Sequence, residues 1–153
     1  MTRQTRANLF FVFWFALFSV GCTNKTTENS RKQDLKKVSA LNTELGFRYM
    51  QEREYDLANK KIEKALAANP KNPEAHNAMG LLKNVLGKSK AAESAFARAV
   101  ELSDNGPAIS NNYGQFLCQQ GRYEEGIKYL SLAAMNPLNR DRSIPHLNLG
   151  KCY

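Results

Sequence analysis

Small and large apolar residues recur at a fixed interval over residues 39–142. An apolar residue followed by glycine occurs at Leu45-Gly46, Met79-Gly80 and Tyr113-Gly114, so the glycines are 34 residues apart. Alanine or glycine follows twelve residues later, then a large apolar residue four residues after that, and alanine three residues further on. These positions are Ala58, Ala92 and Gly126; Ile62, Phe96 and Leu130; and Ala65, Ala99 and Ala133. The interval predicts a chain built from successive copies of one supersecondary unit.

Within each unit the apolar residues follow helical spacing, which predicts two helices joined by a short turn. Gly87 and Gly121 mark turns inside units. Asn69-Pro70 and Asn136-Pro137 mark the ends of units, because proline cannot continue a helix. The predicted helices span residues 39–52, 55–68, 73–86, 89–102, 107–120 and 123–135, and a further helix starts near residue 143.

This register resembles the tetratricopeptide repeat (TPR), a pair of antiparallel helices. The resemblance implies an all-α helical solenoid, with small residues where the two helices of a unit approach closely and large apolar residues between units. The units are residues 39–72, 73–106 and 107–142, followed by 143–153 as the start of an incomplete fourth. Leu149-Gly150 repeats the motif 36 residues after Gly114, which places two extra residues in the third unit. Because the sequence offers no partner for this last helix, we expect the chain to be the N-terminal part of a longer array or a truncated product.

Residues 1–21 differ in composition from the rest of the chain. Arg3 and Arg6 precede an unbroken apolar run of ten residues, Leu9 to Phe18, and no acidic residue occurs before Glu28. The run is shorter than the roughly 20 residues that a membrane-spanning helix needs. It is typical of a secretory signal.

Gly21-Cys22 follows this run and resembles the bacterial lipobox, although Ser19 stands where the lipobox usually has leucine. The resemblance implies that residues 1–21 are a lipoprotein signal peptide and that Cys22 is acylated as the mature N-terminus. By the sorting rule of Gram-negative lipoproteins, Thr23 after the cysteine implies the periplasmic face of the outer membrane. The alternatives are an ordinary cleaved signal before a cysteine without lipid, and an uncleaved membrane anchor.

The residues that follow Cys22 are polar and charged. Such a segment cannot bury enough apolar surface to offset the entropy of ordering it. We therefore expect residues 22–38 to be a solvated tether between the lipid and the repeats. Contact of its basic residues with anionic lipid headgroups is the alternative.

The formal net charge of the whole chain is +8. Removal of the signal, which contains Arg3 and Arg6, lowers it to +6 for residues 22–153. The remaining lysines are interleaved with glutamates on the predicted helix exteriors, and an exported protein does not meet nucleic acid. We expect no nucleic-acid partner.

No residue pattern indicates catalysis or metal binding. His76 and His146 occupy the same helical position two repeats apart, and helices spaced by roughly 8–10 Å place them too far apart for one metal ion. The sequence contains no phosphate-binding loop and no HExxH motif. We expect no enzyme activity, no small-molecule substrate, no metal, and no cofactor apart from the covalent lipid on Cys22.

The first helix of each pair lines the concave face of a TPR array, and this face is the candidate protein-binding site. Its candidate residues are Phe47, Met50, Asn77, Leu81, Asn84, Asn111, Gln115 and Gln119, with Thr43 and Cys118 on the same face. Apolar anchors beside amides suit a peptide or helix whose backbone the amides can bind. The alternative for Phe47 and Met50 is packing at the start of the array.

Cys118 and Cys152 lie on the predicted first helices of the third and fourth units. Two thiols of an exported protein can form a disulfide where their Cα atoms are about 4.4–6.8 Å apart. The alternative is two small apolar side chains in a helix interface.

The stretch from Asn111 to Cys118, followed by Gly121 to Glu125, is similar to the most characteristic part of the type IV pilus biogenesis/stability lipoproteins of the PilF/PilW type. Pro137-Leu138, ahead of the two extra residues, fits the same family. The resemblance implies a pilotin, an outer-membrane lipoprotein that promotes the localisation and multimerisation of the pilus secretin. Its implied partners are a secretin subunit or another pilus-assembly protein on the concave face, and the membrane through the lipid. The alternative is a TPR lipoprotein scaffold for cell-envelope or peptidoglycan machinery.

Overall fold

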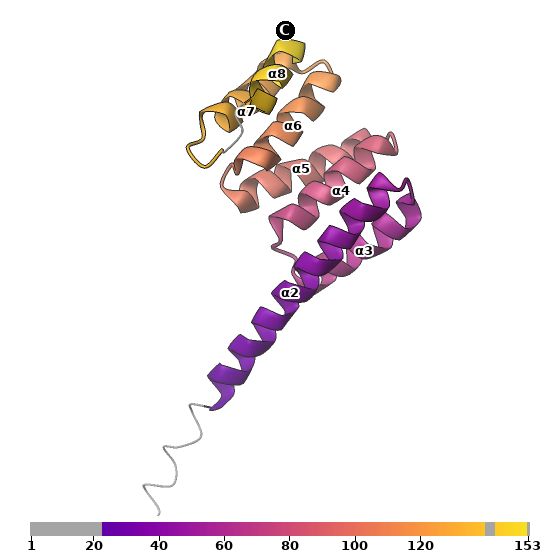
Figure 1. The fold of residues 1–153 in the computed structure, drawn as a ribbon, viewed down its shortest axis with the longest axis vertical. Coiled ribbons are helices and arrows are strands. Elements are labelled where there is room, and N and C mark those ends of the chain that lie inside the picture. The colour runs from indigo at the N-terminus through magenta and orange to yellow at the C-terminus, as the bar shows by residue number, and fades with distance from the viewer. Residues whose placement is uncertain (1–22, 140–142, 153) are drawn as a thin grey trace, which may run out of the picture. The chain divides into compact units, whose positions relative to one another are not determined.

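The computed structural model describes residues 23–139 and 143–152, so the predicted signal peptide of residues 1–21 and Cys22 lie outside the described residues. Every regular element in this part of the chain is a helix (Figure 1). The helices are α2 (Thr23–Gln51), α3 (Tyr55–Ala68), α4 (Pro73–Val85), α5 (Ser89–Ser103), α6 (Pro107–Gln119), α7 (Tyr123–Met135) and α8 (Ser143–Cys152). The predicted all-α solenoid of antiparallel helix pairs is confirmed.

The chain divides by its internal contacts into residues 1–35 and residues 36–153. The described part of the first unit is the N-terminal portion of α2. Its side chains are exposed from Thr27 onward, and Glu28 and Lys32 form an ion pair of 2.6 Å one helical turn apart.

The sequence predicted a helix start near residue 39, and this boundary is wrong, because α2 begins at Thr23. Residues 23–45 contain neither proline nor glycine, so nothing in this stretch breaks a helix. Side-chain pairs one turn apart stabilise a helix that is polar on all sides, and the Glu28–Lys32 pair has this spacing.

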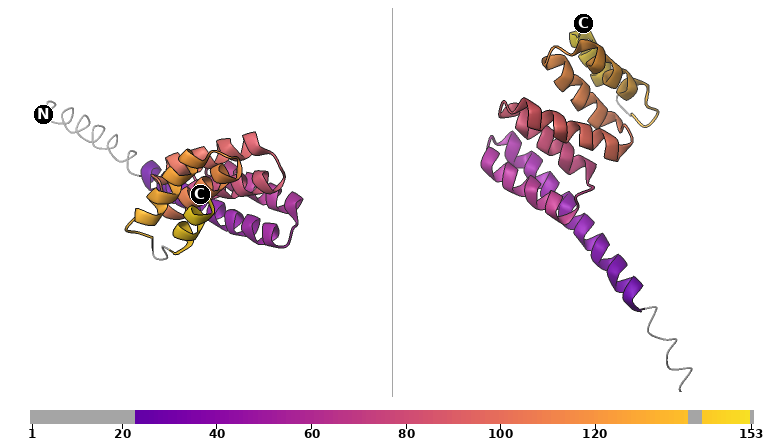
Figure 2. Two further views of the ribbon diagram at one scale, coloured as in Figure 1. Left: turned by 90° about the horizontal axis from the view of Figure 1, so that it is seen from above. Right: turned by 180° about the vertical axis from the view of Figure 1, so that it is seen from behind.

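In the second unit the helices form successive pairs, as Figures 1 and 2 show. Residues 36–51 of α2 pack on α3, α4 packs on α5, and α6 packs on α7. Neighbouring pairs contact one another through α3 and α4 and through α5 and α6, and α8 packs on both α6 and α7.

Three glycines let the two helices of a pair approach closely. A Cβ atom at Gly46 would lie 2.6 Å from Ile62 Cγ1, and one at Gly80 would lie 2.7 Å from Phe96 Cδ1. At Gly114 a Cβ atom would lie 2.8 Å from a backbone oxygen of the facing helix. Real Cβ atoms do not approach other heavy atoms this closely, so the predicted reason for glycine at these positions is confirmed.

Each turn inside a pair closes with a residue in the left-handed conformation, and these residues are 34 positions apart. Gly87 and Gly121 have φ angles of 71° and 78°, and Arg53 occupies the equivalent place with a φ of 62°. The next amide in each turn donates to a carbonyl five residues earlier, as in a Schellman motif. These bonds join Glu54 N to Tyr49 O (2.9 Å), Lys88 N to Lys83 O (2.8 Å) and Arg122 N to Leu117 O (2.9 Å).

Asn72 fastens the start of α4 to α2. Its Oδ1 accepts from the amides of Glu74 (3.0 Å) and Ala75 (3.3 Å), which caps α4 ahead of Pro73. Its Nδ2 donates to the hydroxyl of Ser39 at 2.8 Å in a buried environment. The Asn72 side chain therefore accepts hydrogen bonds from free amides at the start of α4 and also joins the first two repeats.

Apolar side chains of the second helix in each pair fill the space between repeats. Ile62 packs with Ala78 and Leu82 of the next repeat, and Phe96 of α5 lies with its ring centroid 5.3 Å from that of Phe116 in α6. Tyr113 extends this second cluster to Tyr129, at 4.8 Å between centroids. The core is therefore a series of interfaces between successive helix pairs.

Candidate functional site

The apolar residues of the candidate binding face are half-buried. Phe47 and Met50 of α2 pack against the cluster formed by Ala58, Ile62, Ala78 and Leu82, and Leu81 of α4 packs against the next cluster. Each keeps part of its surface accessible. These side chains therefore pack against the core on one side and leave apolar surface accessible to a ligand on the other.

Amide side chains link α4 to α6. Asn112 Nδ2 donates to Asn77 Oδ1 at 3.1 Å, and Asn84 Nδ2 donates to Gln119 Oε1 at 3.1 Å. Asn77 is buried, whereas Gln119 is exposed. Both bonds join the first helix of the second repeat to the first helix of the third. The Asn112–Asn77 bond lies toward their N-terminal ends, and the Asn84–Gln119 bond lies at their C-terminal ends.

A second set of amides links α6 to α8. Asn148 Nδ2 donates to Asn111 Oδ1 at 2.9 Å, and Gln115 Nε2 donates to Asn148 Oδ1 at 3.4 Å. Asn111 and Asn148 are both buried, so each needs a hydrogen-bond partner within the protein. The three amides form a directed chain from Gln115 through Asn148 to Asn111.

These bonds divide the predicted binding residues into two groups. Asn77 and Asn111 use buried amides to hold neighbouring helices, and their role in contacting a ligand stays a prediction. Asn84, Gln115 and Gln119 are accessible. The accessible polar atoms of this face therefore belong mainly to the C-terminal halves of α4 and α6.

The sequence interpretation missed Asn112 and Asn148. Both stand two residues before a repeat glycine, Gly114 or Gly150, so the register itself contains the signal. Because of the two extra residues in the third unit, Asn148 lies 36 residues after Asn112 and outside the 34-residue spacing.

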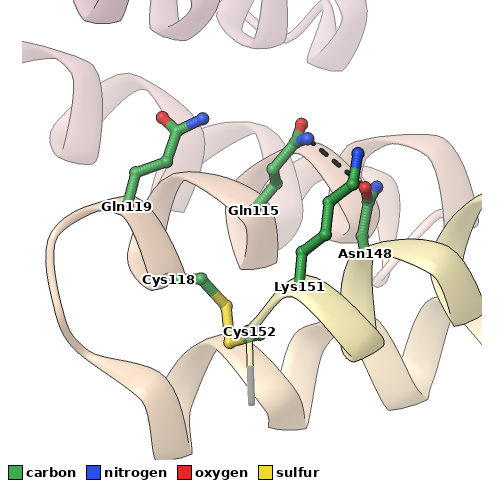
Figure 3. A pocket seen from close by; sticks show the side chains of 6 residues that line it. All are labelled: Gln115, Cys118, Gln119, Asn148, Lys151 and Cys152. Atoms are coloured by element: carbon green, nitrogen blue, oxygen red, sulfur yellow. Dashed lines mark hydrogen bonds between the residues drawn. A yellow bond between two sulfur atoms is a disulfide. The ribbon is translucent and has the colours of Figure 1, made fainter.

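A disulfide joins Cys118 of α6 to Cys152 of α8, with 5.4 Å between the Cα atoms. It lies one helical turn beyond Gln115, so the interface between α6 and α8 contains both a covalent bond and the amide chain (Figure 3). Cys152 is 3% exposed. Together these contacts hold α8 against the third repeat.

A small cavity of about 170 Å³ opens between α6 and α8. Figure 3 shows Gln115, Gln119, Asn148 and Lys151 around it, with the disulfide beside them. Apart from the disulfide its lining residues are polar in type, although most of the surface that they present to the cavity is apolar. They include Gln115 and Gln119, two of the residues predicted to bind protein.

A larger cavity of about 490 Å³ lies beside the N-terminal ends of α6 and α8. Its lining is mainly apolar and includes Pro107, Leu138, Ile144 and Pro145. Leu138 is 80% exposed and Ile144 is 51% exposed, so this cavity offers apolar surface at the opposite end of the same two helices.

Arg122, at the start of α7, connects two repeats by ion pairs. It pairs with Glu93 of α5, and its Nε and Nη2 bond the two carboxylate oxygens of Glu125, each at 2.6 Å. The hydrogen bonds from Arg122 lower the pKa of Glu125 below its ordinary value. This cluster is structural, because it lies on second helices and away from the candidate face.

The two histidines are not brought together. His76 Nε2 lies 2.9 Å from the carbonyl oxygen of Pro70, and His146 is exposed on α8. Within residues 23–139 and 143–152, no three side chains of histidine, cysteine, aspartate or glutamate are grouped so as to hold a metal ion. Among the described helices, none is both long enough and apolar enough to cross a membrane.

The repeat architecture identifies the class of protein. Residues 43–107 and 78–140 each match the family described as Tetratricopeptide repeat, and the chain belongs to this family. TPR arrays are helical scaffolds that bind proteins, and the candidate face described above is the surface of such a scaffold.

More particularly, the chain is homologous to the type IV pilus biogenesis proteins PilF and PilW. The type IV pilus assembly protein PilF of Pseudomonas aeruginosa is 30% identical over 141 residues, which cover 91% of this chain and 56% of that protein. The crystal structure of PilW, a widely conserved type IV pilus biogenesis factor, matches with a TM-score of 0.72 and 33% identity over 75% of this chain and 53% of that one.

The solved structure of P. aeruginosa PilF matches with a TM-score of 0.75 and 28% identity, covering 78% of this chain and 54% of that one. The chain therefore spans about half the length of these relatives.

Proposed function

We propose that this protein is an outer-membrane lipoprotein that acts as a pilotin in type IV pilus biogenesis. Its TPR face would hold a segment of a secretin subunit, or of another pilus-assembly protein, and promote secretin localisation and multimerisation. The observation that carries this proposal is the homology to PilF and PilW over at least three quarters of the chain. That stretch contains the helices that form the candidate face.

The described contacts support a preformed binding surface. The amide bonds fix the spacing of α4, α6 and α8, and the disulfide joins α6 to α8. A surface whose elements are already in place loses little conformational entropy when it binds a flexible segment. The apolar surface of Phe47, Met50 and Leu81 would supply anchors, and the accessible amides would bind the backbone of the segment.

The membrane part of the proposal rests on Cys22, which lies outside the described residues. Each buried methylene of an acyl chain contributes about 0.8 kcal/mol, so several chains on one cysteine hold a protein at a bilayer. Residues 22–38 would then separate the lipid from the repeats as the predicted tether. The part of this segment from Thr23 onward is helical.

Site-specific photocrosslinking in cells tests the binding face. A photoreactive residue would replace Leu81 or Gln119 on the candidate face, and Lys64 on the exposed side of α3 serves as the matched control. We expect secretin adducts from the first two positions and none from Lys64. Equal adducts at all three positions, or adducts without secretin or any other pilus-assembly protein, would contradict the proposal.

Two genetic variants test the pilotin role itself. Deletion of the gene should reduce secretin multimers in the outer membrane, and Cys22→Ala should leave the secretin mislocalised. Normal secretin multimers in the deletion strain would exclude a pilotin. Normal localisation with Cys22→Ala would remove only the lipid from the mechanism.

A further inference from the structure

The connection between α5 and α6, which joins the second repeat to the third (Figure 1), contains two successive left-handed residues that are not glycine. Asp104 has a φ of 49° and Asn105 has a φ of 58°. This conformation is unfavourable for a residue with a Cβ atom, and asparagine and aspartate are the residues other than glycine that adopt it most readily. Gly106 comes next, and this is the one position in the sequence where glycine follows asparagine.

Asn105 and Gly106 together hold the two groups that can close a ring. The backbone nitrogen of Gly106 can attack Cγ, the carbonyl carbon of the Asn105 side chain, to form a cyclic imide. Because glycine has no Cβ atom, no side chain on Gly106 obstructs this approach. Asn105 is half-buried, and in the described part of the chain its side chain makes no hydrogen bond. The side chain is therefore free to turn toward the nitrogen.

The other asparagines are less suited to this reaction. Asn69, Asn72 and Asn136 precede proline, whose nitrogen carries no hydrogen and cannot attack in this way. Most of the others, including Asn84, lie inside helices, where the next N–H bonds a carbonyl of the same helix and holds the backbone in place. Asn105 is therefore distinguished both by the residue that follows it and by its place in a turn.

Ser103 restrains the nitrogen of Gly106. The Gly106 N–H donates to Ser103 Oγ at 3.2 Å, and Ser103 Oγ donates to the carbonyl oxygen of Val100 at 3.2 Å. Both bonds are at the long end of the usual range. The nitrogen must lose its proton before it can attack, and the Ser103 hydroxyl holds that N–H in the folded turn. Ring closure therefore requires this bond to break, so Ser103 limits how often the reaction starts.

We infer that Asn105 is a site of spontaneous covalent modification whose rate is limited by Ser103. The bond between Gly106 N and Asn105 Cγ forms, and the bond between Cγ and the side-chain nitrogen breaks. That nitrogen takes up the proton lost by Gly106 and leaves as ammonia. Water then adds to one of the two carbonyls of the cyclic imide. Hydrolysis at Cγ gives aspartate, and hydrolysis at the backbone carbonyl gives isoaspartate, in which the main chain runs through Cβ.

Either product changes the connection between two repeats. Both products add a negative charge beside Asp104, and isoaspartate also lengthens the main chain by one carbon atom between α5 and α6. The modification needs water and no ligand, so it goes beyond the proposed function and does not depend on it.

Incubation of the purified, folded protein in mildly alkaline buffer prepared with ¹⁸O-labelled water tests the inference, because alkaline conditions favour loss of the amide proton. Peptide mass spectrometry should find conversion at Asn105, with one ¹⁸O atom in the new carboxyl group, and little conversion at Asn84 within α4. Electron-transfer fragmentation should identify isoaspartate. Only the cyclic intermediate produces isoaspartate, since direct hydrolysis of the side chain gives aspartate alone.

Three variants localise the reaction. Gly106→Ala should slow it, because a Cβ atom there crowds the nitrogen and would lie 3.2 Å from Ser103 Cβ. Ser103→Ala should speed it about two- to tenfold, as loss of one neutral hydrogen bond implies, and should also speed hydrogen exchange of the Gly106 amide. Glu101→Gln removes an exposed ion pair with Arg98 on the same helix. It is the matched control and should change neither rate.

Each outcome of these experiments decides the inference. Conversion concentrated at Asn105, with isoaspartate among the products and the expected order of rates, supports it. No conversion at Asn105 in the folded protein, conversion at Asn84 to the same extent, or aspartate without isoaspartate would overturn it. A rate for Ser103→Ala that is unchanged or lower would overturn the role of Ser103.

Discussion

Asn148 in α8 donates a hydrogen bond of 2.9 Å to Asn111 in α6, 37 residues earlier in the chain, and both side chains are buried. The bond crosses the interface between two successive first helices, where Gln115 and the Cys118–Cys152 disulfide also lie. Because neither amide is exposed to water, each depends on the other. Together with the disulfide, this pair holds α8, and with it the cavity beside Lys151, against α6.

The first prediction concerns this pair of asparagines. Asn148→Ala leaves the buried Oδ1 of Asn111 without its donor, and should lower the free energy of unfolding by about 1–3 kcal/mol. Asn111→Ala should cost a similar amount. The double variant should cost clearly less than the sum, which urea denaturation followed by circular dichroism will measure. Additive effects would show that the two amides do not interact.

The second prediction concerns the disulfide, which closes a loop with a sequence separation of 34. Removal of a cross-link over a loop of this length should lower the free energy of unfolding by about 2–4 kcal/mol. Reductant should therefore shift the urea midpoint of the protein to lower concentration. The double variant Cys118→Ala/Cys152→Ala is the control, and its midpoint should not respond to reductant. An unchanged midpoint of the parent protein would contradict the cross-link.

The third prediction compares two glycines in the same register. A Cβ atom at Gly80 would lie 2.7 Å from the buried ring of Phe96, so Gly80→Ala should destabilise the protein by about 1–3 kcal/mol. Among the described residues, no heavy atom outside the adjoining residues and the backbone of α8 itself lies within 4 Å of a Cβ atom built at Gly150. Gly150→Ala should therefore raise stability by up to about 1 kcal/mol through helix propensity. Thermal unfolding of both variants tests the contrast, and equal destabilisation would refute it.

The fourth prediction concerns Arg53, which has a φ of 62° where the later turns have Gly87 and Gly121. A left-handed conformation costs a non-glycine residue about 1–2 kcal/mol. Glycine avoids this cost, but it also increases the conformational entropy of the unfolded chain, which offsets part of the gain in stability. Arg53→Gly should raise the free energy of unfolding by about 0.5–1 kcal/mol. Gly87→Ala is the matched opposite change and should lower it. A loss of stability with Arg53→Gly would show that the arginine side chain stabilises the turn.

The fifth prediction concerns the dependence of stability on pH. Hydrogen bonds from Arg122 lower the pKa of Glu125 below its ordinary value of 4.5. A carboxylate whose pKa is lower in the folded state contributes stability that is fully present above 4.5 and is lost as the pH falls through the folded-state pKa.

Glu125→Gln should therefore have a lower urea midpoint than the parent protein at pH 7. The two midpoints should become equal in acid. Arg122→Gln should behave in the same direction, with the added loss of the pair to Glu93. A difference between Glu125→Gln and the parent protein that persists unchanged into acid would contradict the pairing.

Much of the repeat architecture could be predicted from the sequence because it depends on contacts between near neighbours. Gly80 and Phe96 are 16 residues apart, and their close approach follows from the lengths of two helices and one turn. The N-terminal boundary of α2 could not be predicted in this way. The side chains of residues 27–38 are exposed, and the Glu28–Lys32 pair has the spacing that stabilises a helix without burial, so the apolar pattern gave no sign of this part of α2.

The candidate face was predicted only in part. The register correctly places Gln115 and Gln119 on the first helix of the third repeat, where both line a cavity. It does not distinguish them from Asn77 and Asn111, which have the same side-chain chemistry but are buried and bonded to neighbouring helices. Burial of an amide depends on how far adjacent helices are rotated about their axes. The residue type alone does not indicate this rotation.

By itself the sequence determined the repeat, its period and the positions of its small and large apolar residues, whereas the pairing of Cys118 with Cys152 was decided by the tertiary structure. A solenoid makes this possible, because each unit contacts only its neighbours and repeats the same packing of one helix pair. Only the tertiary structure decided which amides bond to one another, and that Lys151 and Gln119 border one cavity. The two extra residues before α8 change the spacing of the last repeat, so the contacts between α6 and α8 depend on the three-dimensional position of α8 and not on the period.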